Sequence, residues 1–417
     1  MRQGLSIEAA RCCVLDAVRL LPPETCAVED ALGRVLAEAV RSHRTLPPAD
    51  CSAMDGYAVR AADLASASRE AAVLLPVAYE VAAGGAASPP LPTRHAARIF
   101  TGAALPPGAD TIVRQEDTEP DASGVRFLVA PPRGLDVRPA GEDVGAGDLV
   151  LDVGAAIGPA EIGMLAALGR SHVVVRRRPR VAVLSGGDEL IEPDGDPSGG
   201  RIVASNSYSL AALARAAGAE ATYLGIARDT PEALEEKLRA GLHADAIVSS
   251  AGVSVGDRDY VRPVLEKLGC TLVFWGVRMK PGYPLAFGRF GEAGPLVFGL
   301  PGNPVSAMVT FELFVRPALR RMAGHARPFR PVIEARLAHD LEKAAGRAHL
   351  VRVTLERTPD GFLARSTGSQ SSGVLRSMAL ADGLLVFPAE AVRLAAGEKA
   401  TVQLLDDSFF DSAEPGF

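Results

Sequence analysis

The chain has 417 residues, more than one hydrophobic core usually serves, so we expect several domains. Apolar residues make up 48% and charged residues 23%, and a net charge of -6 argues against a nucleic-acid-binding surface. Five cysteines without a C-x-x-C pair suggest neither a zinc site nor a disulfide framework, and no apolar stretch is long enough for a membrane span, so we expect a cytoplasmic protein.

The first part of the chain predicts two helices and a small β-rich region. Ser6 is a plausible N-cap for a helix over residues 7–21, and a second short helix is expected over 28–40. Short β-type runs among Gly and Pro clusters then predict a β-rich domain, with strands over residues 73–81, 111–113 and 125–129. A helix over 159–168 follows, with Pro159 at its start and Gly169 at its end.

From about residue 180 the predicted elements alternate between strands and helices. The strands are expected over residues 181–184, 221–226, 246–249, 272–275 and 296–298, and the helices over 207–217, 231–240, 260–268 and 303–322, the last bent near Pro317. Such alternation predicts a parallel sheet with helices on both faces.

From about residue 330 the pattern is all-β. Short strands are expected over residues 332–337, 349–356, 362–366, 384–387 and 401–405, with a hairpin turn at Asp360-Gly361, and a small β-barrel is the best interpretation. The predicted fold class is therefore a multidomain α/β plus β protein.

Three polar, glycine-rich segments follow predicted strands, where ligands of open α/β sheets bind. The glycines of residues 185–190 allow close backbone approach, and Asp188 and Glu189 can hold a cation or a proton; the alternative is a turn with a solvated acidic pair. Residues 249–259 suit a phosphate at a helix N-terminus, with Mg²⁺ bridging to Asp257 and Asp259; the alternative is a plain helix cap. Residues 299–304 form a stiff turn that either faces a ligand or is purely structural.

Other segments carry charges or capping groups. Lys280 is a fixed cation in residues 278–284, and Asn206 belongs to a helix start that is either ligand-facing or an ordinary N-cap. Carboxylates (Asp55, Glu189, Asp229, Asp259) and cations (Lys280, Arg352) in separate loops are consistent with Mg²⁺-dependent chemistry on a phosphoanhydride.

Several motifs together resemble a known family. Residues 52–60 (S-A-M-D-G-Y-A-V-R), 100–103, 141–143, 187–190, 252–257 and 299–304 occur in the order found in molybdopterin molybdenumtransferases of the MoeA type, the molybdenum insertases. The resemblance runs from about residue 5 to residue 405.

The resemblance implies four domains and a reaction. Residues 1–44 and 143–178 would form an elongated helical part, 45–142 an inserted β-rich domain, 179–326 the α/β molybdopterin-binding domain and 327–417 a C-terminal β-barrel. The resemblance further implies a homodimer whose active-site cleft takes the inserted domain from the other subunit. The reaction that the resemblance implies converts adenylylated molybdopterin and molybdate, with Mg²⁺, to molybdenum cofactor and AMP. Possible partners are an adenylyltransferase and molybdoenzymes.

The resemblance also implies roles for individual residues. Catalytic roles fall to Asp55, Thr101, Asp143, Glu189, Asp229 and Asp259. Pterin contacts fall to Ser185, Gly187, Asp188, Asn206, Gly252, Ser254, Gly256, Asp257, Pro301 and Asn303. Molybdate would be held by Lys280, Arg352 and Ser372, and Mg²⁺ by Asp188, Glu189, Asp257 and Asp259.

Two positions depart from the family pattern. Tyr283 stands where the family usually has a second lysine, in K-P-G-K-P, and Ala251 stands where it commonly has a glycine. Losing one charge-assisted hydrogen bond predicts molybdate binding weaker by about tenfold or more, unless another cation compensates. Two alternatives therefore stand beside the insertase: a catalytically weakened paralogue that acts as a pterin-binding scaffold, and the related molybdopterin adenylyltransferase, which shares the α/β module.

Overall fold

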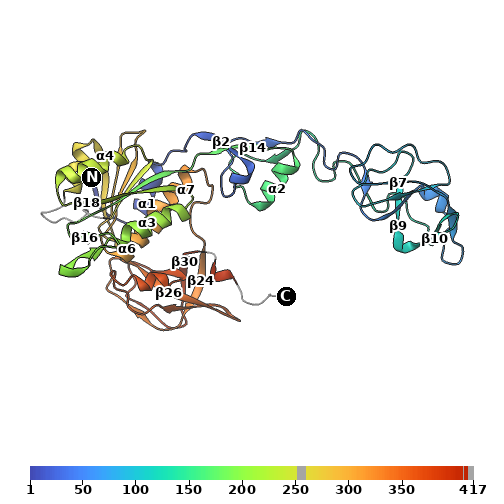
Figure 1. The fold of residues 1–417 in the computed structure, drawn as a ribbon. Coiled ribbons are helices and arrows are strands. Elements are labelled where there is room, and N and C mark those ends of the chain that lie inside the picture. Colours follow the sequence, from blue (N-terminus) through green and yellow to red (C-terminus); the bar gives the residue numbers. More distant parts are fainter. Residues whose placement is uncertain (251–259, 407, 412–417) are drawn as a thin grey trace. The chain divides into compact units, whose positions relative to one another are not determined.

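The computed structural model describes residues 1–250, 260–406 and 408–411, and the chain divides into two compact units. The first unit comprises Met1–Ala37, Gly154–Pro159 and His172–Phe417. The second comprises Glu38–Val153 and Ala160–Ser171. Figure 1 shows the elements of both, and each unit is described by itself.

A seven-stranded sheet forms the centre of the first unit. Its strands lie in the order β1 (Arg2–Leu5), β20 (Cys270–Val277), β22 (Ala286–Phe290), β23 (Leu296–Gly299), β19 (Ala246–Ser249), β15 (Arg180–Gly186) and β18 (Glu220–Ala227). The expectation of an all-parallel sheet is wrong for β22, which runs antiparallel to both neighbours. The reason is the short connection over residues 291–295, in which the Gly294 amide donates to the Phe290 carbonyl at 2.9 Å. So few residues can join only antiparallel strands.

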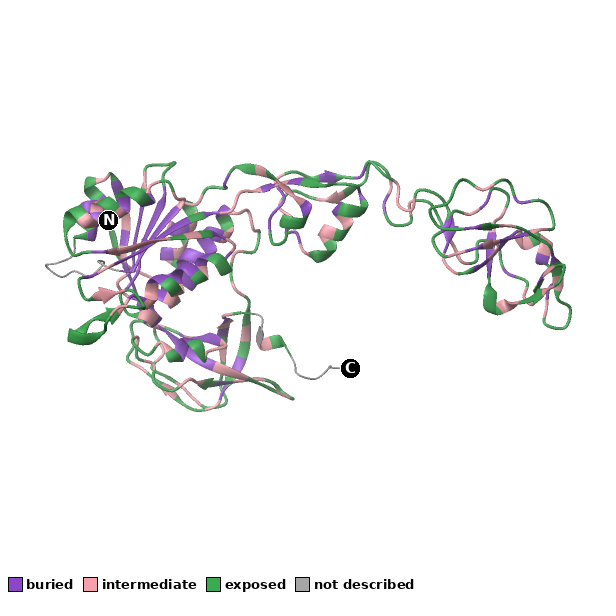
Figure 2. Cartoon of the chain, viewed as in Figure 1, coloured by how far each residue is buried: buried purple, intermediate pink, exposed green. Residues whose placement is uncertain are grey.

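Helices cover both faces of this sheet. One face carries α1 (Ile7–Asp16), α3 (Ser205–Ala216), α6 (Pro304–Thr310) and α7 (Arg316–Met322), and the other carries α4 (Pro231–Gly241) and α5 (Val261–Lys267). Alternation within β15 explains the two cores: Val181 and Val183 pack on the first set of helices, and Ala182 and Leu184 on the second. Figure 2 shows the sheet as a buried layer between helices with exposed outer faces.

Three predicted helices differ from the observed ones. The helix expected over 303–322 is interrupted by a π-helical turn, Phe311–Val315, just before Pro317, because the proline ring cannot pack against a regular preceding turn. The first helix ends at Asp16 rather than at residue 21. The helix expected over 28–40 is wrong: only a 3₁₀ turn, Val28–Asp30, forms, and Gly33 then adopts a positive φ of 73°.

The C-terminal part is the predicted barrel. Its strands are β24 (Val332–Leu337), β26 (Ala348–Thr358), β27 (Gly361–Ser366), β28 (Gly383–Phe387) and β30 (Lys399–Leu404), and the sheet closes because β26 pairs with both β27 and β28. Val351, Val353 and Leu385 fill the barrel, whereas Leu350 and Leu384 join the core of the α/β sheet. The barrel is therefore packed on the α/β domain through its own strands.

Shorter elements complete the first unit. The strand β21 (Met279–Lys280) pairs in parallel with β26, and β2 (Pro23–Ala27) pairs antiparallel with β14 (His172–Arg176). The remaining ones are β16 (Leu190–Ile191), β17 (Ile202–Val203), β25 (Leu341–Glu342), β29 (Arg393–Leu394), α8 (Arg376–Ala379) and the 3₁₀ turns Ser198–Gly200 and Ser408–Phe410.

The second unit is β-rich, as predicted. It contains β3 (Val40–Arg41), β4 (Cys51–Ser52), β5 (Gly56–Val59), β6 (Val73–Leu75), β7 (Val77–Val81), β8 (Ala96–Ile99), β9 (Thr111–Arg114), β10 (Thr118–Asp121), β11 (Gly124–Phe127), β12 (Val137–Arg138), β13 (Leu149–Leu151), the 3₁₀ turns Ala61–Leu64 and Gln115–Asp117, and nearly all of α2 (Pro159–Ala167). The strand expected over 73–81 is split at Pro76, which has no N–H for a ladder bond.

The remaining features concern the length of the helices and the state of the cysteines. None of the helices within the described residues is long and apolar enough to cross a membrane. All five cysteines are free thiols.

Candidate functional site

A pocket of about 710 Å³ lies at the carboxyl edge of the central sheet. Ligand pockets commonly have this size and this position in open α/β folds. Its walls come from the ends of β15, β18 and β19, the start of α3, and the turn before α6. Gly373 and Leu375, from a barrel loop, complete the wall, so both domains of the first unit shape it.

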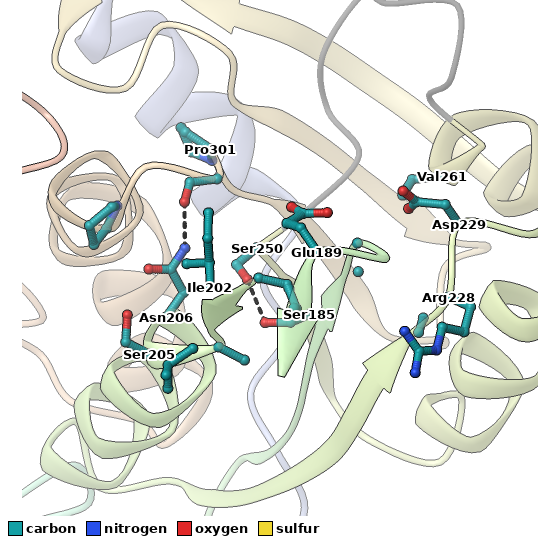
Figure 3. A pocket seen from close by; sticks show the side chains of 18 of the residues that line it. Ser185, Glu189, Ile202, Ser205, Asn206, Arg228, Asp229, Ser250, Val261 and Pro301 are labelled. Carbon is teal, nitrogen blue, oxygen red and sulfur yellow. Dashed lines mark hydrogen bonds between the residues drawn. The ribbon is translucent and has the colours of Figure 1, made fainter. Parts of the chain in front are cut away.

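A cluster of three buried serines includes two, Ser185 and Ser250, that line this pocket. Ser185, at the end of β15, lies 2.9 Å from the Ser250 hydroxyl (Figure 3). It also makes a short hydroxyl contact with Ser207 of α3. A hydroxyl both donates and accepts, so this cluster can reorient toward a polar ligand without leaving a buried group unpaired. The sequence singled out Ser185 alone; Ser207 was readable only as part of a helix cap.

The start of α3 is tied to the turn before α6. The Asn206 amide donates to the Gly302 carbonyl at 2.6 Å, as Figure 3 shows. Asn206 and Pro301 both line the pocket. Asn303 instead is the N-cap of α6 and is absent from the pocket lining among the described residues.

Three carboxylates lie around the loop after β15. Glu189 and Asp229 line the pocket, and Asp188 pairs with Asp229 through reciprocal backbone bonds: the Asp229 amide lies 3.3 Å from Asp188 Oδ1 and the Asp188 amide 3.4 Å from Asp229 Oδ2. Gly187 has a φ of 145°, and a Cβ there would lie 2.5 Å from Glu189 Oε2. The glycine therefore makes room for the Glu189 carboxylate.

The expected metal ligands are only partly described. Gly252, Ser254, Gly256, Asp257 and Asp259 lie outside the described residues, as does Ala251. Among the residues that the structure does describe, no group of three or more His, Cys, Asp or Glu side chains converges as a metal site would. The described carboxylates have the hard oxygen donors that Mg²⁺ prefers, but they would supply only part of its coordination.

Arg352 is the centre of a buried cationic region. Its side chain is fully buried; Nε donates to Ser377 Oγ (3.2 Å), and one terminal nitrogen donates to the carbonyls of Ser371 (3.1 Å) and Ser369 (3.4 Å). The other terminal nitrogen, NH1, has no hydrogen-bond partner in the described part of the chain. Burial lowers the pKa of Arg352 to about 10, which is still high enough for a full charge at neutral pH.

His349 lies beside this arginine on the same strand. It is buried, its Nε2 has no hydrogen-bond partner among the described residues, and it pairs in register with the exposed Lys280. Burial, followed by the charges of Lys280 and Arg352, lowers the pKa of His349 to about 4, so the imidazole is neutral near pH 7. The sequence pattern marked Lys280 and Arg352 but not His349, which looked like an ordinary strand residue.

A barrel loop connects this region to the pocket. Residues 369–375 accept hydrogen bonds from Arg352 at one end and contribute Gly373 and Leu375 to the pocket wall at the other. Between them, the half-buried Ser372 accepts a hydrogen bond from the Val305 amide at its carbonyl (3.1 Å). Arg352 and Ser372 are thus linked to the pocket wall through this loop, whereas Lys280 lies on the short strand β21.

The second unit carries a separate pair of expected residues. Asp55 Oδ1 accepts hydrogen bonds from both the amide and the hydroxyl of Thr101, each at 2.8 Å, and these bonds lower the pKa of Asp55. Gly56 has to be glycine, because a Cβ would lie 2.0 Å from the Val113 carbonyl oxygen. Asp143 is exposed, and its amide donates to the Leu46 carbonyl at 3.0 Å.

Three consecutive family profiles match the chain. They are the MoeA N-terminal region (domains I and II) over residues 5–169, a probable molybdopterin-binding domain over 182–321 and the MoeA C-terminal region (domain IV) over 334–405. The pocket and the cationic region lie in the second and third of these.

Relatives match over most of their length. A molybdopterin molybdenumtransferase from Nostoc is 40% identical over 89% of this chain and 86% of its own, and molybdopterin molybdenumtransferase 1 from Mycobacterium tuberculosis is 37% identical over 92% and 95%. The crystal structure of a molybdopterin biosynthesis MoeA protein from Pyrococcus horikoshii superposes with a TM-score of 0.81 at 30% identity, covering 96% of this chain and 100% of that one. With these matches and this arrangement of domains, the chain belongs to the MoeA family of molybdopterin molybdenumtransferases.

Proposed function

We propose that this protein inserts molybdenum into molybdopterin, taking molybdate and adenylylated molybdopterin and releasing AMP and molybdenum cofactor. The observation that carries the proposal is the buried Arg352, whose NH1 has no partner among the described residues and whose neighbouring loop forms a wall of the pocket. A buried guanidinium with a free donor is costly unless an anion completes it.

The pocket supports binding of the pterin substrate. Ser185, Ser250 and Asn206 offer polar groups on its floor and side, while Ile202 and Leu375 offer apolar surface for a flat ring system. Convergent polar groups in a largely apolar wall are typical of small-molecule sites. The carboxyl edge of the sheet is also where the family resemblance places the pterin.

The cationic region supports binding of an oxyanion. Arg352 NH1 and the Lys280 ammonium are donors, and His349 Nε2 adds a further group without a partner in the described structure. Molybdate is a tetrahedral dianion that needs several donors at once, and arginine and lysine are the side chains that provide charge-assisted hydrogen bonds. Ser372 belongs to the 369–375 loop, which accepts hydrogen bonds from Arg352, and it is our candidate for a hydroxyl contact.

Mg²⁺ is proposed as the cofactor, held by Glu189 and Asp229 with help from substrate oxygens. Magnesium usually takes one or two protein carboxylates and completes its coordination shell with phosphate oxygens and water. Two protein carboxylates are therefore enough for a magnesium site that the substrate completes. When bound, the ion would neutralise charge on the phosphate oxygens of the substrate. Asp188, through its bonds to Asp229, would position the second carboxylate.

Other properties are proposed from the family resemblance alone. These are the homodimer, a cytoplasmic location, and catalytic roles for Asp55, Thr101, Asp143 and Asp259. Partners that deliver the adenylylated pterin or accept the cofactor belong to the same group.

The test is AMP release from purified protein supplied with adenylylated molybdopterin, Mg²⁺ and molybdate. We expect release that requires both molybdate and Mg²⁺ and that is lost in Arg352→Gln. The matched control is Arg336→Gln, an exposed arginine on barrel strand β24, which should behave as wild type.

The same assay separates the alternatives. Tight pterin binding without AMP release would identify a pterin-binding scaffold protein, the alternative that is supported by tyrosine in place of lysine at position 283. ATP-dependent formation of the adenylylated pterin would instead identify an adenylyltransferase. AMP release that is indifferent to molybdate would contradict the insertase.

A further inference from the structure

An arginine is stacked on the tyrosine that replaces the family lysine. The Arg347 guanidinium carbon lies 4.7 Å from the centre of the Tyr283 ring, within the range of a cation–π contact. The ring also makes an edge-on aromatic contact with Trp275, at 5.6 Å between ring centres and 84° between planes. Tyr283 is half-buried and Arg347 is exposed, so the ring is a fixed platform and the cation lies on its outer side.

This arginine is held at the turn that carries Lys280. The Val277 amide donates to the Tyr283 carbonyl at 3.0 Å, which closes a turn containing Lys280. Directly after Arg347, the Ala348 amide donates to the Arg278 carbonyl at 3.1 Å, where β26 pairs with β21. The next residue of the turn, Pro284, lines the pocket.

The charge of Arg347 is available to a ligand. Arg347 forms no ion pair with any carboxylate of the described residues. Two residues further along β26, His349 feels the charges of both Lys280 and Arg352. Positive charge therefore gathers at this edge without a carboxylate to neutralise Arg347.

We propose that Arg347, held on the ring of Tyr283, supplies the second exposed cation of the oxyanion site, so that the Tyr283–Arg347 pair takes the place of one lysine. This inference rests on the proposed molybdate site. It predicts that the protein binds molybdate without the loss that Tyr283 alone would cause. It also makes Arg347 a specificity residue that the family motif does not contain.

The direct test is equilibrium dialysis of the full-length protein with molybdate, with AMP release measured in parallel. Arg347→Ala should weaken molybdate binding about tenfold, the effect of losing one charge-assisted contact. Tyr283→Phe keeps the ring and should stay within about twofold of wild type. Tyr283→Leu removes the platform and should weaken binding, with little further loss when combined with Arg347→Ala.

A rescue variant makes the test specific. Tyr283→Lys should not improve the wild-type protein, but it should restore molybdate binding in the Arg347→Ala background. The matched control is Arg357→Ala, because Arg357 also lies over aromatic rings, those of Phe409 and Phe410, at the other end of β26. Its molybdate affinity should equal that of wild type, and thermal unfolding of every variant identifies any that has lost its fold.

The possible outcomes distinguish this inference from the proposed function. Molybdate-dependent AMP release by the wild type, with unchanged molybdate affinity in Arg347→Ala, would overturn the role of Arg347 alone. Improved affinity of Tyr283→Lys in the otherwise wild-type protein would do the same. A wild-type protein that neither binds molybdate nor releases AMP in response to it would overturn the proposed function and this inference together.

Discussion

Replacing Gly187 by alanine is a precise probe of the pocket loop. The φ of Gly187 is 145°, a region in which side chains are strained by about 1–3 kcal/mol. The added Cβ would lie 2.5 Å from Glu189 Oε2 and 2.7 Å from Oε1. Because carbon makes contact at about 3.5 Å or more, the carboxylate has to move by about 1 Å.

That displacement should appear in the magnesium dependence of the reaction. If Glu189 holds Mg²⁺, an ångström of misplacement is expected to lower AMP release by about tenfold to a hundredfold at limiting Mg²⁺. The measurement is a Mg²⁺ titration of AMP release, with the midpoint of chemical unfolding determined for the same preparation. We expect the midpoint to fall together with the apparent Mg²⁺ affinity.

Gly218→Ala is the matched control. Gly218 follows α3 with a φ of 90°, and a Cβ there would meet nothing within 4 Å. It should lose comparable stability from backbone strain alone and keep the wild-type Mg²⁺ titration. A Gly187→Ala protein that is destabilised but titrates with Mg²⁺ like Gly218→Ala would refute the argument that Glu189 is a metal ligand placed by this glycine.

Three further predictions concern other parts of the molecule. Thr101→Val removes one of the two hydrogen bonds that lower the pKa of Asp55, so this pKa should rise and the acid limb of the pH profile of AMP release should move to higher pH. The control is Thr118→Val, because the Thr118 hydroxyl donates to the Gln115 carbonyl and not to Asp55, and it should leave the profile unchanged. The pKa of His349 is about 4 in the folded protein, whereas a histidine in the unfolded chain is protonated below about pH 6.5. The free energy of unfolding should therefore fall by up to about 3 kcal/mol as the pH is lowered from 6.5 to 4. His349→Phe should remove this part of the pH dependence in unfolding measurements. Glu192 accepts hydrogen bonds from Tyr208 (2.9 Å) and Tyr223 (3.0 Å) beside the β16–β17 segment, which lines the pocket. Glu192→Ala should therefore raise the KM for the pterin several-fold while kcat stays close to wild type. An unchanged KM would show that these two hydrogen bonds do not position the pocket wall.

The sequence predicted regular elements well where local rules decide them. The barrel strands were confirmed, and a hairpin turn joins β26 to β27 as expected, although Pro359 and Asp360 form it and Gly361 already begins β27. No strand was predicted over residues 286–290, so β22 and its antiparallel direction were both missed. The expected helix over 28–40 failed because tertiary pairing, such as the Leu36–Val175 bridge, overrides weak helical periodicity.

The site was predictable in its parts and not in its assembly. Motifs marked Ser185, Glu189, Asp229, Lys280 and Arg352. Only the fold shows that the barrel loop bonded to Arg352 also forms part of the pocket wall. His349 and Arg347 lie in a stretch without any motif. Their importance comes from an unpartnered buried nitrogen and from a contact with Tyr283, and neither can be derived from residue order.

The antiparallel strand β22 determines where Lys280 and Tyr283 lie in the chain, namely in a loop between two adjacent strands. In a wholly parallel sheet, the chain leaving β20 would have to cross over through a helix to begin the next strand. Here it turns back at once, so residues 278–285 form a tip that carries Lys280 and Tyr283 and belongs to no helix or helix cap. If Lys280 and Tyr283 contact the anion as proposed, substitutions at these two positions change the anion site directly, whereas Met279 and Leu285 of the same tip are buried in the core under the helices. Divergence among relatives in the oxyanion they prefer would then be concentrated in this hairpin tip and in the barrel residues that touch it.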